Sequence, residues 1–442
     1  MDTICAISTA YGTGGIAVIR VSGEESIRIV DTLFHGRTAL SDAKAGTVHY
    51  GKIQNSKAEV LDEVLCSVFR APHSFTGEDT VEIACHGSVF IQQELLRWLI
   101  DAGCRAAEPG EFTRRAFLNG KMDLTQAEAV ADLIASQSKA EKDLALSQLR
   151  GSVSNELGAL RERLLHFTSL IELELDFADH EELEFADRTE LNALAAEIET
   201  KLRALMNSFQ TGNAIRHGIP VAIVGAPNVG KSTLLNALLG EQRAIVSDIK
   251  GTTRDTIEDT LVLDGILFRL IDTAGLRETN DLLENMGIER SRQAIEKAQI
   301  ILYVSDDGNW EMDEEGLHGR VLHVLNKIDY APDPALLCCV LDCIGVSAKY
   351  NEVEELKRKL VEVARESMHT SAVMLSNARH YEAVSRAHEA ILRVQEGLQE
   401  GLSGELLSMD LQDCLNALGE VTGQITNAEV LANIFNKFCI GK

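Results

Sequence analysis

The sequence predicts a multidomain protein with an α+β N-terminal domain, an all-α helical domain, and an α/β domain inserted into the helical one. Residues 1–120 mix short apolar strands with helices, whereas residues 216–370 alternate buried strands and helices, as a parallel sheet requires. Helical periodicity occupies residues 121–215 and returns in residues 371–442. Because an insertion is easily accommodated when its two ends lie close together, we expect the two helical segments to form one domain.

The composition is typical of a soluble globular chain. The 442 residues are 45% hydrophobic and 25% charged, and the net charge of −26 disfavours a protein that coats RNA, because phosphate contacts need Lys and Arg. We expect no signal peptide and no membrane partner, since no stretch approaches the roughly 20 apolar residues of a spanning helix. Nine scattered cysteines predict a reduced, cytoplasmic protein, with Cys338, Cys339 and Cys343 in the core.

The N-terminal region is expected to contain three strands and a helix. The strands are predicted at residues 16–21, 64–68 and 80–84, and the helix at residues 89–100. Arg20 and Glu82 lie inside two of these apolar strands. Such a charge lies either on a solvated face of the sheet or in a functional site, and spacing alone favours the solvated face.

The helical segments show apolar residues three or four positions apart. One buried helix face is predicted by Leu157, Leu160, Leu164, Phe167 and Ile171. An acidic loop is expected at residues 179–182, and Gly212 and Gly218 are expected to mark the junction with the α/β domain. Later helices are predicted at residues 379–399, 406–418 and 429–438.

A glycine-rich loop, Gly225–Ser232, has the pattern Gly-x4-Gly-Lys-Ser between an apolar strand, residues 219–224, and a Leu-rich helix, residues 233–239. Backbone N–H groups of such a loop can surround a phosphate, and the helix N-terminus directs its dipole at it. Lys231 can reach the β- and γ-phosphates, and the Ser232 hydroxyl can bind Mg²⁺. The flanking strand and helix disfavour the alternative of a plain Gly-rich turn.

Four further motifs follow. The polar segment Gly251–Asp255 offers a threonine hydroxyl to Mg²⁺, and the glycine of Asp272–Gly275 can donate to the γ-phosphate. Asn326–Asp329 ends a strand, and its last carboxylate can accept two hydrogen bonds from guanine N1 and N2, which adenine does not offer. Ser347–Lys349 ends the next strand and can contact guanine O6 through a backbone N–H.

Five motifs in this order predict a P-loop domain that binds GTP and hydrolyses it by attack of water on the γ-phosphate. A hairpin at residues 261–268 with an Asp264–Gly265 turn and strands at residues 300–304 and 321–325 complete the sheet. The predicted nucleotide-binding residues are Asn228, Val229, Gly230, Lys231, Ser232, Thr233, Ser247, Asp248, Ile249, Lys250, Gly251, Thr252, Thr253, Asp272, Thr273, Ala274, Gly275, Asn326, Lys327, Asp329, Ser347, Ala348 and Lys349. Ser232 and Thr253 are the predicted Mg²⁺ ligands.

No glutamine follows the Asp272–Gly275 motif to position the attacking water, because the next residues are Leu276 and Arg277. Glu278 and Glu284 are nearby candidates. From the chemistry of the residues alone, each could equally be a solvated carboxylate at the start of a helix.

The chain resembles the TrmE/Era-type GTPases, and within them the TrmE-type tRNA modification GTPases. The likeness covers nearly the full length of the chain. It rests on the stretches Gly14–Gly23, Ser74–Asp79, Pro109–Thr113, Ala116–Lys121, Gly225–Ser232, Gly251–Asp255, Asp272–Arg277 and Phe438–Lys442.

The resemblance implies an N-terminal domain that forms a homodimer and binds a 5-formyl- or 5,10-methylene-tetrahydrofolate. By motif position, the folate contacts would be Arg20, Glu82, Lys121 and Lys442, which reverses the interpretation of the two strand charges. The resemblance also implies a heterotetramer with an FAD-dependent partner, MnmG (GidA). Together they would place an aminomethyl or carboxymethylaminomethyl group on C5 of the wobble uridine, position 34, of certain tRNAs.

The same resemblance implies that GTP hydrolysis depends on K⁺. The matching K⁺ ligands would be Asn228, Ser247, Ile249 and Thr252, and Glu284 would orient the attacking water.

Lys231 and Cys439 complete the candidate catalytic residues. A near-terminal cysteine is more often a small buried hydrophobe, and the C-terminal end of a helix does not lower a thiol pKa. The role of Cys439 therefore stays open.

A ribosome-assembly GTPase switch is the alternative function. Such a switch would be expected to carry a basic RNA-binding appendage, whereas this chain is acidic and has a folate-like N-terminal region. The motif contexts therefore favour tRNA modification.

Overall fold

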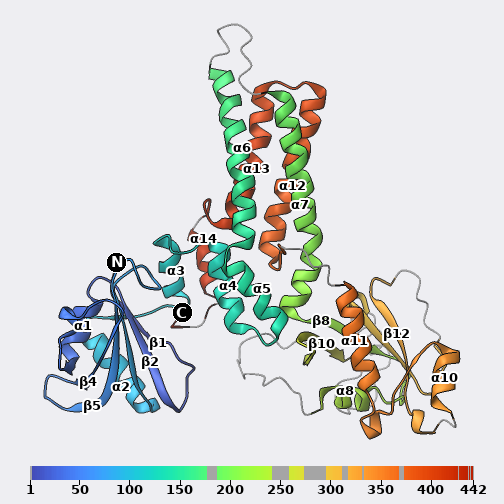
Figure 1. Ribbon diagram of the computed structural model, residues 1–442, viewed down its shortest axis with the longest axis horizontal. Coiled ribbons are helices and arrows are strands. Elements are labelled where there is room, and N and C mark those ends of the chain that lie inside the picture. Colours follow the sequence, from blue (N-terminus) through green and yellow to red (C-terminus); the bar gives the residue numbers. More distant parts are fainter. Residues whose placement is uncertain are drawn as a thin grey trace, which may run out of the picture. The chain divides into compact units, whose positions relative to one another are not determined.

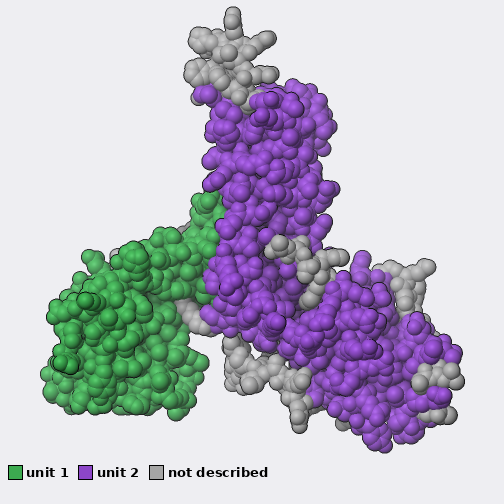
Figure 2. Space-filling view, viewed as in Figure 1, with its two compact units in different colours: residues 1–131, 419–442 green, residues 132–418 purple. Residues whose placement is uncertain are grey.

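The computed structural model describes residues 2–176, 187–240, 258–272, 295–310, 317–330, 333–367, 373–426, 428–436, 438 and 440–441. The chain divides into two compact units, residues 1–131 with 419–442 and residues 132–418 (Figure 2). The predicted domain boundaries after residues 120, 215 and 370 stay predictions.

The first unit is built on a seven-stranded sheet with the strand order β3-β4-β5-β6-β2-β1-β7. Its strands are β1 Ile4–Ile7, β2 Gly14–Ser22, β3 Phe34–Gly36, β4 Thr47–Gln54, β5 Val60–Phe69, β6 Thr80–Gly87 and β7 Arg105–Ala106. Neighbouring strands are antiparallel, except that β1 pairs with β7 in parallel. The three predicted strands are confirmed as parts of β2, β5 and β6, and the α+β class of this region is confirmed.

Two helices, α1 Ser26–Leu33 and α2 Val89–Asp101, share one core with the sheet. Ile19 and Val21 of β2 and Ile83 of β6 are fully buried in that core. Because side chains alternate along a strand, Arg20 and Glu82 lie on the opposite face, and the register pairs them directly. The sheet therefore places Arg20 and Glu82, two of the four predicted folate contacts, side by side.

The C-terminal residues of the chain also belong to this unit. Helix α14, Ala428–Phe435, lies against α3, Glu111–Leu118. Phe438 buries its ring beside Phe435 at a centroid distance of 5.4 Å, in a cluster that includes Leu124. A Cβ added at Gly441 would lie 2.2 Å from the backbone oxygen of Ile7, so only glycine permits this close approach of the chain's end to β1.

The second unit contains long helices and a second sheet (Figure 1). The helices of this unit that lie outside the α/β segment are α5 Lys139–Leu149, α6 Ser152–Asp176, α7 Arg188–His217 and α12 Ala378–Glu400. Two further helices, α4 Leu124–Ala135 and α13 Gly404–Thr422, begin or end across the boundary between the units.

Helices α7 and α12, which flank the α/β segment in sequence, run side by side (Figure 1). Phe209 stacks on Tyr381 with ring centroids 4.6 Å apart. Gly212, expected at a junction, lies inside α7, and a Cβ there would be 2.1 Å from the Leu375 oxygen. Glycine is therefore needed for close packing against the returning chain, and the expectation that the two helical segments pack together is confirmed.

The second sheet has the order β13-β12-β11-β8-β10-β9. Its elements are β8 Ile219–Val224, α8 Lys231–Leu239, β9 Glu258–Leu263, β10 Ile266–Asp272, β11 Ile300–Ser305, β12 Arg320–Leu325, α10 Pro334–Leu341, β13 Ile344–Gly345 and α11 Glu354–Ser367. All pairs are parallel except β9 with β10. The predicted hairpin is confirmed, since Asp264 and Gly265 have φ of +48° and +79°, as a two-residue turn with both φ positive requires.

Strand β8 is buried on both faces of this sheet, and a separate apolar core covers each face. Val221 and Ile223 pack with α8 and α11, whereas Ala222 and Val224 pack with Ile301 on the other face. A continuous apolar strand is typical of a parallel sheet covered on both sides. The predicted α/β domain is therefore confirmed as a fold.

The expectation of a core position is wrong for three cysteines. Cys338 and Cys343 are half-buried and Cys339 is exposed, because residues 334–341 form a surface helix, α10. Across the described ranges, no helix combines the length and the apolar character that crossing a membrane requires.

Candidate functional site

The P-loop joins β8 to α8 through a backbone that only glycine can adopt at two positions. Gly225 has φ of +147° and Gly230 has φ of +96°. A Cβ would lie 2.1 Å from the Val304 oxygen at the first position and 2.3 Å from the Asn326 Nδ2 at the second. Helix α8 begins at Lys231, so its first N–H groups face the loop, where they favour an anion such as phosphate.

Lys231 folds back over the loop. Its Nζ donates hydrogen bonds to the backbone oxygens of Gly225 at 2.8 Å and Ala226 at 2.7 Å. Ser232 and Thr233, in the first turn of α8, are exposed. A positive charge and two hydroxyl-bearing residues thus surround the same helix end, as a site for a phosphate chain requires.

Asn326 connects the P-loop to the segment after β13. It is 3% exposed, donates from Nδ2 to the Val229 oxygen at 2.8 Å, and accepts from the Ala348 N–H at 3.2 Å. Asn326 therefore holds two loops in place rather than facing solvent. Since the Ala348 N–H is engaged by Asn326, the Lys349 N–H is the better candidate to reach guanine O6.

Lys327 follows in a left-handed conformation with φ of +63°. Its Nζ donates to the Asn228 oxygen at 3.1 Å and pairs with Asp306 at 2.6 Å. Asp306, directly after β11, was not predicted from sequence because an aspartate after a strand has no motif around it. The pair fixes the lysine stem along the P-loop.

Asp329 is exposed and oriented by one neighbour. Its Oδ1 accepts from the Ser347 hydroxyl at 2.7 Å, and Ser347 itself is fully buried. A carboxylate has about four acceptor positions. Asp329 therefore keeps acceptor capacity for the two N–H donors of a guanine edge.

These segments meet at one edge of the sheet. The parallel strands β8, β10, β12 and β13 all present their carboxyl ends there, and β10 ends at Asp272 in register with Ile223. Open α/β sheets bind ligands at this edge. The structure thus brings together the predicted residues from Asn228 to Thr233 and from Asn326 to Lys349.

The other predicted residues, or their side chains, lie outside the described part of the chain. They are Ser247, Asp248, Ile249, Lys250, Gly251, Thr252, Thr253, the Asp272 side chain, Thr273, Ala274, Gly275, Glu278, Glu284, Cys439 and Lys442.

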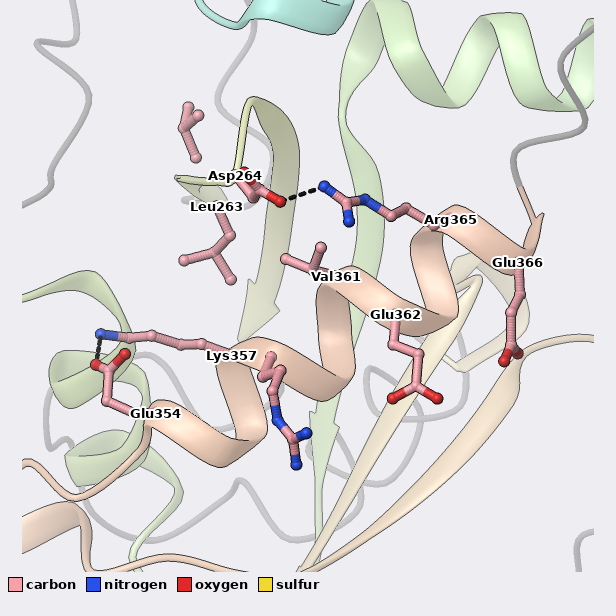
Figure 3. Close-up of a pocket in the computed structure, with 10 residues that line it drawn as sticks. Leu263, Asp264, Glu354, Lys357, Val361, Glu362, Arg365 and Glu366 are labelled. Atoms are coloured by element: carbon pink, nitrogen blue, oxygen red, sulfur yellow. Dashed lines mark hydrogen bonds and ion pairs between the residues drawn. The ribbon is translucent and has the colours of Figure 1, made fainter.

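A hollow of about 840 Å³ between the β9–β10 hairpin and α11 is separate from this edge (Figure 3). Two ion pairs lie within its lining, Lys357 with Glu354 at 2.8 Å and Arg365 with Asp264. The lining has four acidic and three basic side chains, so it differs from a phosphate site.

In the first unit, Arg20 and Glu82 form an ion pair on the sheet face away from the main core. The guanidinium Nε and Nη2 lie 2.9 Å and 2.8 Å from the Glu82 Oε1. The side chains are only 19% and 30% exposed. The solvated-face interpretation is therefore wrong, because the two charges neutralise each other in a half-buried position.

Two aromatic rings stand over Arg20. The guanidinium carbon lies 5.3 Å from the Phe75 ring centroid and 5.5 Å from that of Phe112. Both rings were inside the motif stretches, but nothing in the sequence assigned them this place. A cation near an aromatic ring gains cation–π attraction. Phe112 is fully buried and Phe75 is 36% exposed, so Phe75 is the ring beside Arg20 that a ligand can reach.

Lys121 lies close to the loop that carries Phe75. Its Nζ donates to the Pro72 oxygen at 2.9 Å, and its Cγ lies 3.3 Å from where a Cβ on Gly77 would be. The structure thus connects the predicted contact Lys121 to the loop beside Arg20. In the described ranges there is no cluster of three His, Cys, Asp or Glu residues arranged to hold a metal ion.

The fold and the sheet-edge site together define a P-loop GTPase. Residues 3–121 match the family model of the GTP-binding protein TrmE N-terminus, and residues 124–439 match that of the MnmE helical domain. The chain belongs to the MnmE family.

Close relatives match along the whole chain. The tRNA modification GTPase MnmE of Parabacteroides distasonis is 54% identical, with 100% of both chains covered. The corresponding protein of Bacteroides fragilis is 50% identical, covering 100% of this chain and 99% of its own. Among solved structures, Aquifex aeolicus Era bound to GDP·AlF4⁻ is 27% identical over 39% of this chain and 66% of its own, with a TM-score of 0.26.

Proposed function

We propose that GTP hydrolysis by this tRNA modification GTPase depends on K⁺. With an FAD-dependent partner the GTPase would install an aminomethyl or carboxymethylaminomethyl group at C5 of the wobble uridine of certain tRNAs. A methylene-tetrahydrofolate would supply the one-carbon unit. The observation that supports the proposal is that one chain of this family has both a P-loop with an exposed Asp329 beside it and the half-buried Arg20–Glu82 pair next to the exposed Phe75 ring.

Nucleotide binding is assigned to three groups of atoms. The α8 N-terminus and Lys231 would hold the phosphates, and Asp329 would accept from guanine. The exposed Ser232 hydroxyl is a hard oxygen ligand of the kind that Mg²⁺ prefers, so the residues present fit that ion. Thr253 is proposed as its second ligand from the protein.

Asn228 supports the proposal of K⁺. It is exposed within the P-loop at φ of +65°, and its amide carbonyl is a neutral oxygen donor. A cation bound there would supply positive charge near the bond that breaks. Ser247, Ile249 and Thr252 are the further proposed ligands, and Glu284 would orient the attacking water.

The surroundings of Arg20 in the first unit support the proposal of a folate. A pteridine ring can stack on the exposed face of Phe75, and its polar edge can hydrogen-bond Glu82 or Arg20. Lys121 and Lys442 would attract the glutamate tail. A homodimer and a heterotetramer with MnmG (GidA) are proposed as the assemblies that act on tRNA.

Nucleoside analysis tests the proposed activity. A strain that lacks the native protein is complemented with this chain, and wobble uridines are analysed by mass spectrometry. The C5 modification should return with the parent chain and not with Lys231→Ala. Normal wobble uridines in the deletion strain, together with defective ribosomal subunits, would instead favour the ribosome-assembly switch.

Steady-state turnover tests the proposed ion. The parent should hydrolyse GTP faster in KCl than in NaCl, and Asn228→Ala should lose that difference. Glu284→Ala should bind GTP but hydrolyse it slowly. Equal rates in both salts would contradict the K⁺ proposal, and parental turnover in Glu284→Ala would make Glu278 the better candidate.

A further inference from the structure

Two cysteines of the GTPase domain are brought together by the end of helix α10. Asp342, after the helix, has φ of +49°, and the Cys343 N–H then donates to the Cys338 oxygen at 3.1 Å. A left-handed residue followed by a bond back across five residues is a common way for a helix to end. This turn brings Cys343 back beside Cys338, and the Cys338 thiol is close enough to help raise the pKa of the Cys343 thiol.

The pair lies directly behind the guanine-recognition segment. A Cβ added at Gly345 of β13 would lie 2.6 Å from the Cys338 Sγ and 3.2 Å from the Ile328 Cγ2. The thiol and the isoleucine thus pack on the same glycine. Ile328 is the residue before Asp329, and Gly345 lies two residues before Ser347, so movement of Cys338 affects both sides of the guanine site.

We propose that Cys338 and Cys343 are a redox modification site, at which a peroxide converts the two thiols to a disulfide that weakens GTP binding. Both thiols are half-buried and therefore within reach of a small oxidant. The proposal rests on the assignment of Asp329 to guanine, and its experiment separates the two.

The chemistry balances with one molecule of hydrogen peroxide. The Cys338 thiolate attacks a peroxide oxygen, the S–O bond forms as the O–O bond breaks, and the released hydroxide takes a proton to become water. The Cys343 sulfur then attacks the sulfenic sulfur of Cys338. The S–S bond forms as the S–O bond breaks, and hydroxide leaves with the Cys343 proton as a second water.

The two thiols differ in their roles. Burial and, next, the neighbouring Cys338 raise the pKa of the Cys343 thiol to about 12. Cys343 therefore stays protonated and serves as the second thiol of the sequence.

Closure should disturb nucleotide binding because the S–S bond of a disulfide is shorter than the contact distance between two separate thiols. The two sulfurs must approach to about 2.05 Å, so the Cys338 Sγ moves away from its contact with Gly345. Ile328, which packs on the same glycine, can then move as well. Loss of one charge-assisted hydrogen bond between Asp329 and guanine would weaken binding about 10- to 100-fold.

The test uses the full chain, hydrogen peroxide and a fluorescent GDP derivative. Peptide mass mapping should find a Cys338–Cys343 crosslink after peroxide treatment, and the nucleotide affinity should fall and then recover with dithiothreitol. Cys339→Ser, which removes the exposed neighbour, should behave as the parent. Cys343→Ser should form no crosslink and should keep its affinity through a brief peroxide exposure.

Each other outcome overturns the proposal. Absence of the crosslink, a crosslink through Cys339 instead, or a crosslink with unchanged affinity would each do so. A guanine site that lies elsewhere is recognised separately, because the reduced Asp329→Asn protein would then bind the GDP derivative as the parent does.

Discussion

The two candidate sites of this chain are built in different ways. At the sheet edge of the GTPase domain, glycines and strand ends position backbone groups, and Asn326 and Ser347 fix the loops around them. On the N-terminal sheet, the Arg20–Glu82 ion pair lies beside Phe75 of a loop and Phe112 of α3. A site formed by backbone groups can be recognised from a sequence motif, because only glycine fits at positions 225 and 230. A site formed by side chains shows in the sequence only as the alternation of residues along a strand.

The two sites also differ in whether their charged side chains already have a partner of opposite charge. Asp329 is exposed and keeps free acceptor positions, so a ligand adds hydrogen bonds without displacing a partner. Arg20 already shares its charge with Glu82 in a half-buried place. A ligand at Arg20 must therefore join an existing ion pair, and the energetic effect of one substitution is expected to be smaller there.

The largest expected effect is at Asp329. Asp329→Asn replaces an acceptor with a donor opposite guanine N1 or N2 and should lower GTP affinity about 10²- to 10⁴-fold, because two charge-assisted hydrogen bonds are lost. Xanthosine triphosphate should bind the variant better than GTP does. Titration with both nucleotides measures the change.

Asp342→Asn is the matched control for that substitution. Asp342 is also an exposed aspartate of this domain, and asparagine tolerates its φ of +49°. The control should keep the GTP preference of the parent. If Asp329→Asn still preferred GTP over xanthosine triphosphate, guanine would not bind at this edge of the sheet. The comparison between the two candidate sites would then no longer hold.

A smaller effect is expected at Arg20. Arg20→Ala removes one charge-assisted contact and should weaken binding of 5-formyltetrahydrofolate about 10- to 100-fold in calorimetry. Arg20→Lys keeps the charge but loses the planar fork, and should give an intermediate affinity. Arg28→Ala, an exposed arginine of α1, is the control. Parental affinity in Arg20→Ala would place the folate site elsewhere.

The sequence predicted the architecture well because its signals are local. The apolar run at residues 219–224 and the Asp264–Gly265 turn each specify their own structure. The aromatic neighbours of Arg20 could not be predicted, since Phe75 and Phe112 reach Arg20 only through tertiary packing. Cys338 was misplaced for a similar reason, because an apolar segment such as residues 334–341 can form a surface helix as readily as a core strand.

Ser347 refines the comparison within the GTPase domain. Ser347→Ala removes the hydroxyl that orients Asp329 but leaves the carboxylate, so GTP affinity should fall only about three- to tenfold. The preference for GTP over xanthosine triphosphate should persist. A loss as large as that of Asp329→Asn in the same titration would mean that Ser347 shapes the loop backbone as well.

The smallest expected effect concerns the charge pairs of the N-terminal unit. The Arg105 guanidinium, which hydrogen-bonds the Asp2 carboxylate, lowers the pKa of Asp2 from 3.8 to about 2. Arg115 adds a second contact at 2.9 Å. Because the folded pKa is below the unfolded one, this contribution to stability is present above about pH 4 and is lost as the pH falls towards 2. The Asp2 side chain is 56% exposed, so solvent screening keeps the contribution small.

Hydrogen exchange in the peptides of β1 and α3 measures this contribution locally. Asp2→Asn should exchange faster than the parent at pH 7, and the two should converge when both are compared near pH 2. Asp42→Asn, an exposed carboxylate of the same unit, should match the parent at both pH values. A difference between Asp2→Asn and the parent that persists in acid would assign the effect to packing of Asp2 rather than to its charge. The stability of the N-terminal unit would then depend on the packing of residue 2, much as the P-loop depends on close packing at its glycines. The two regions would then differ less in how their residues are held in place.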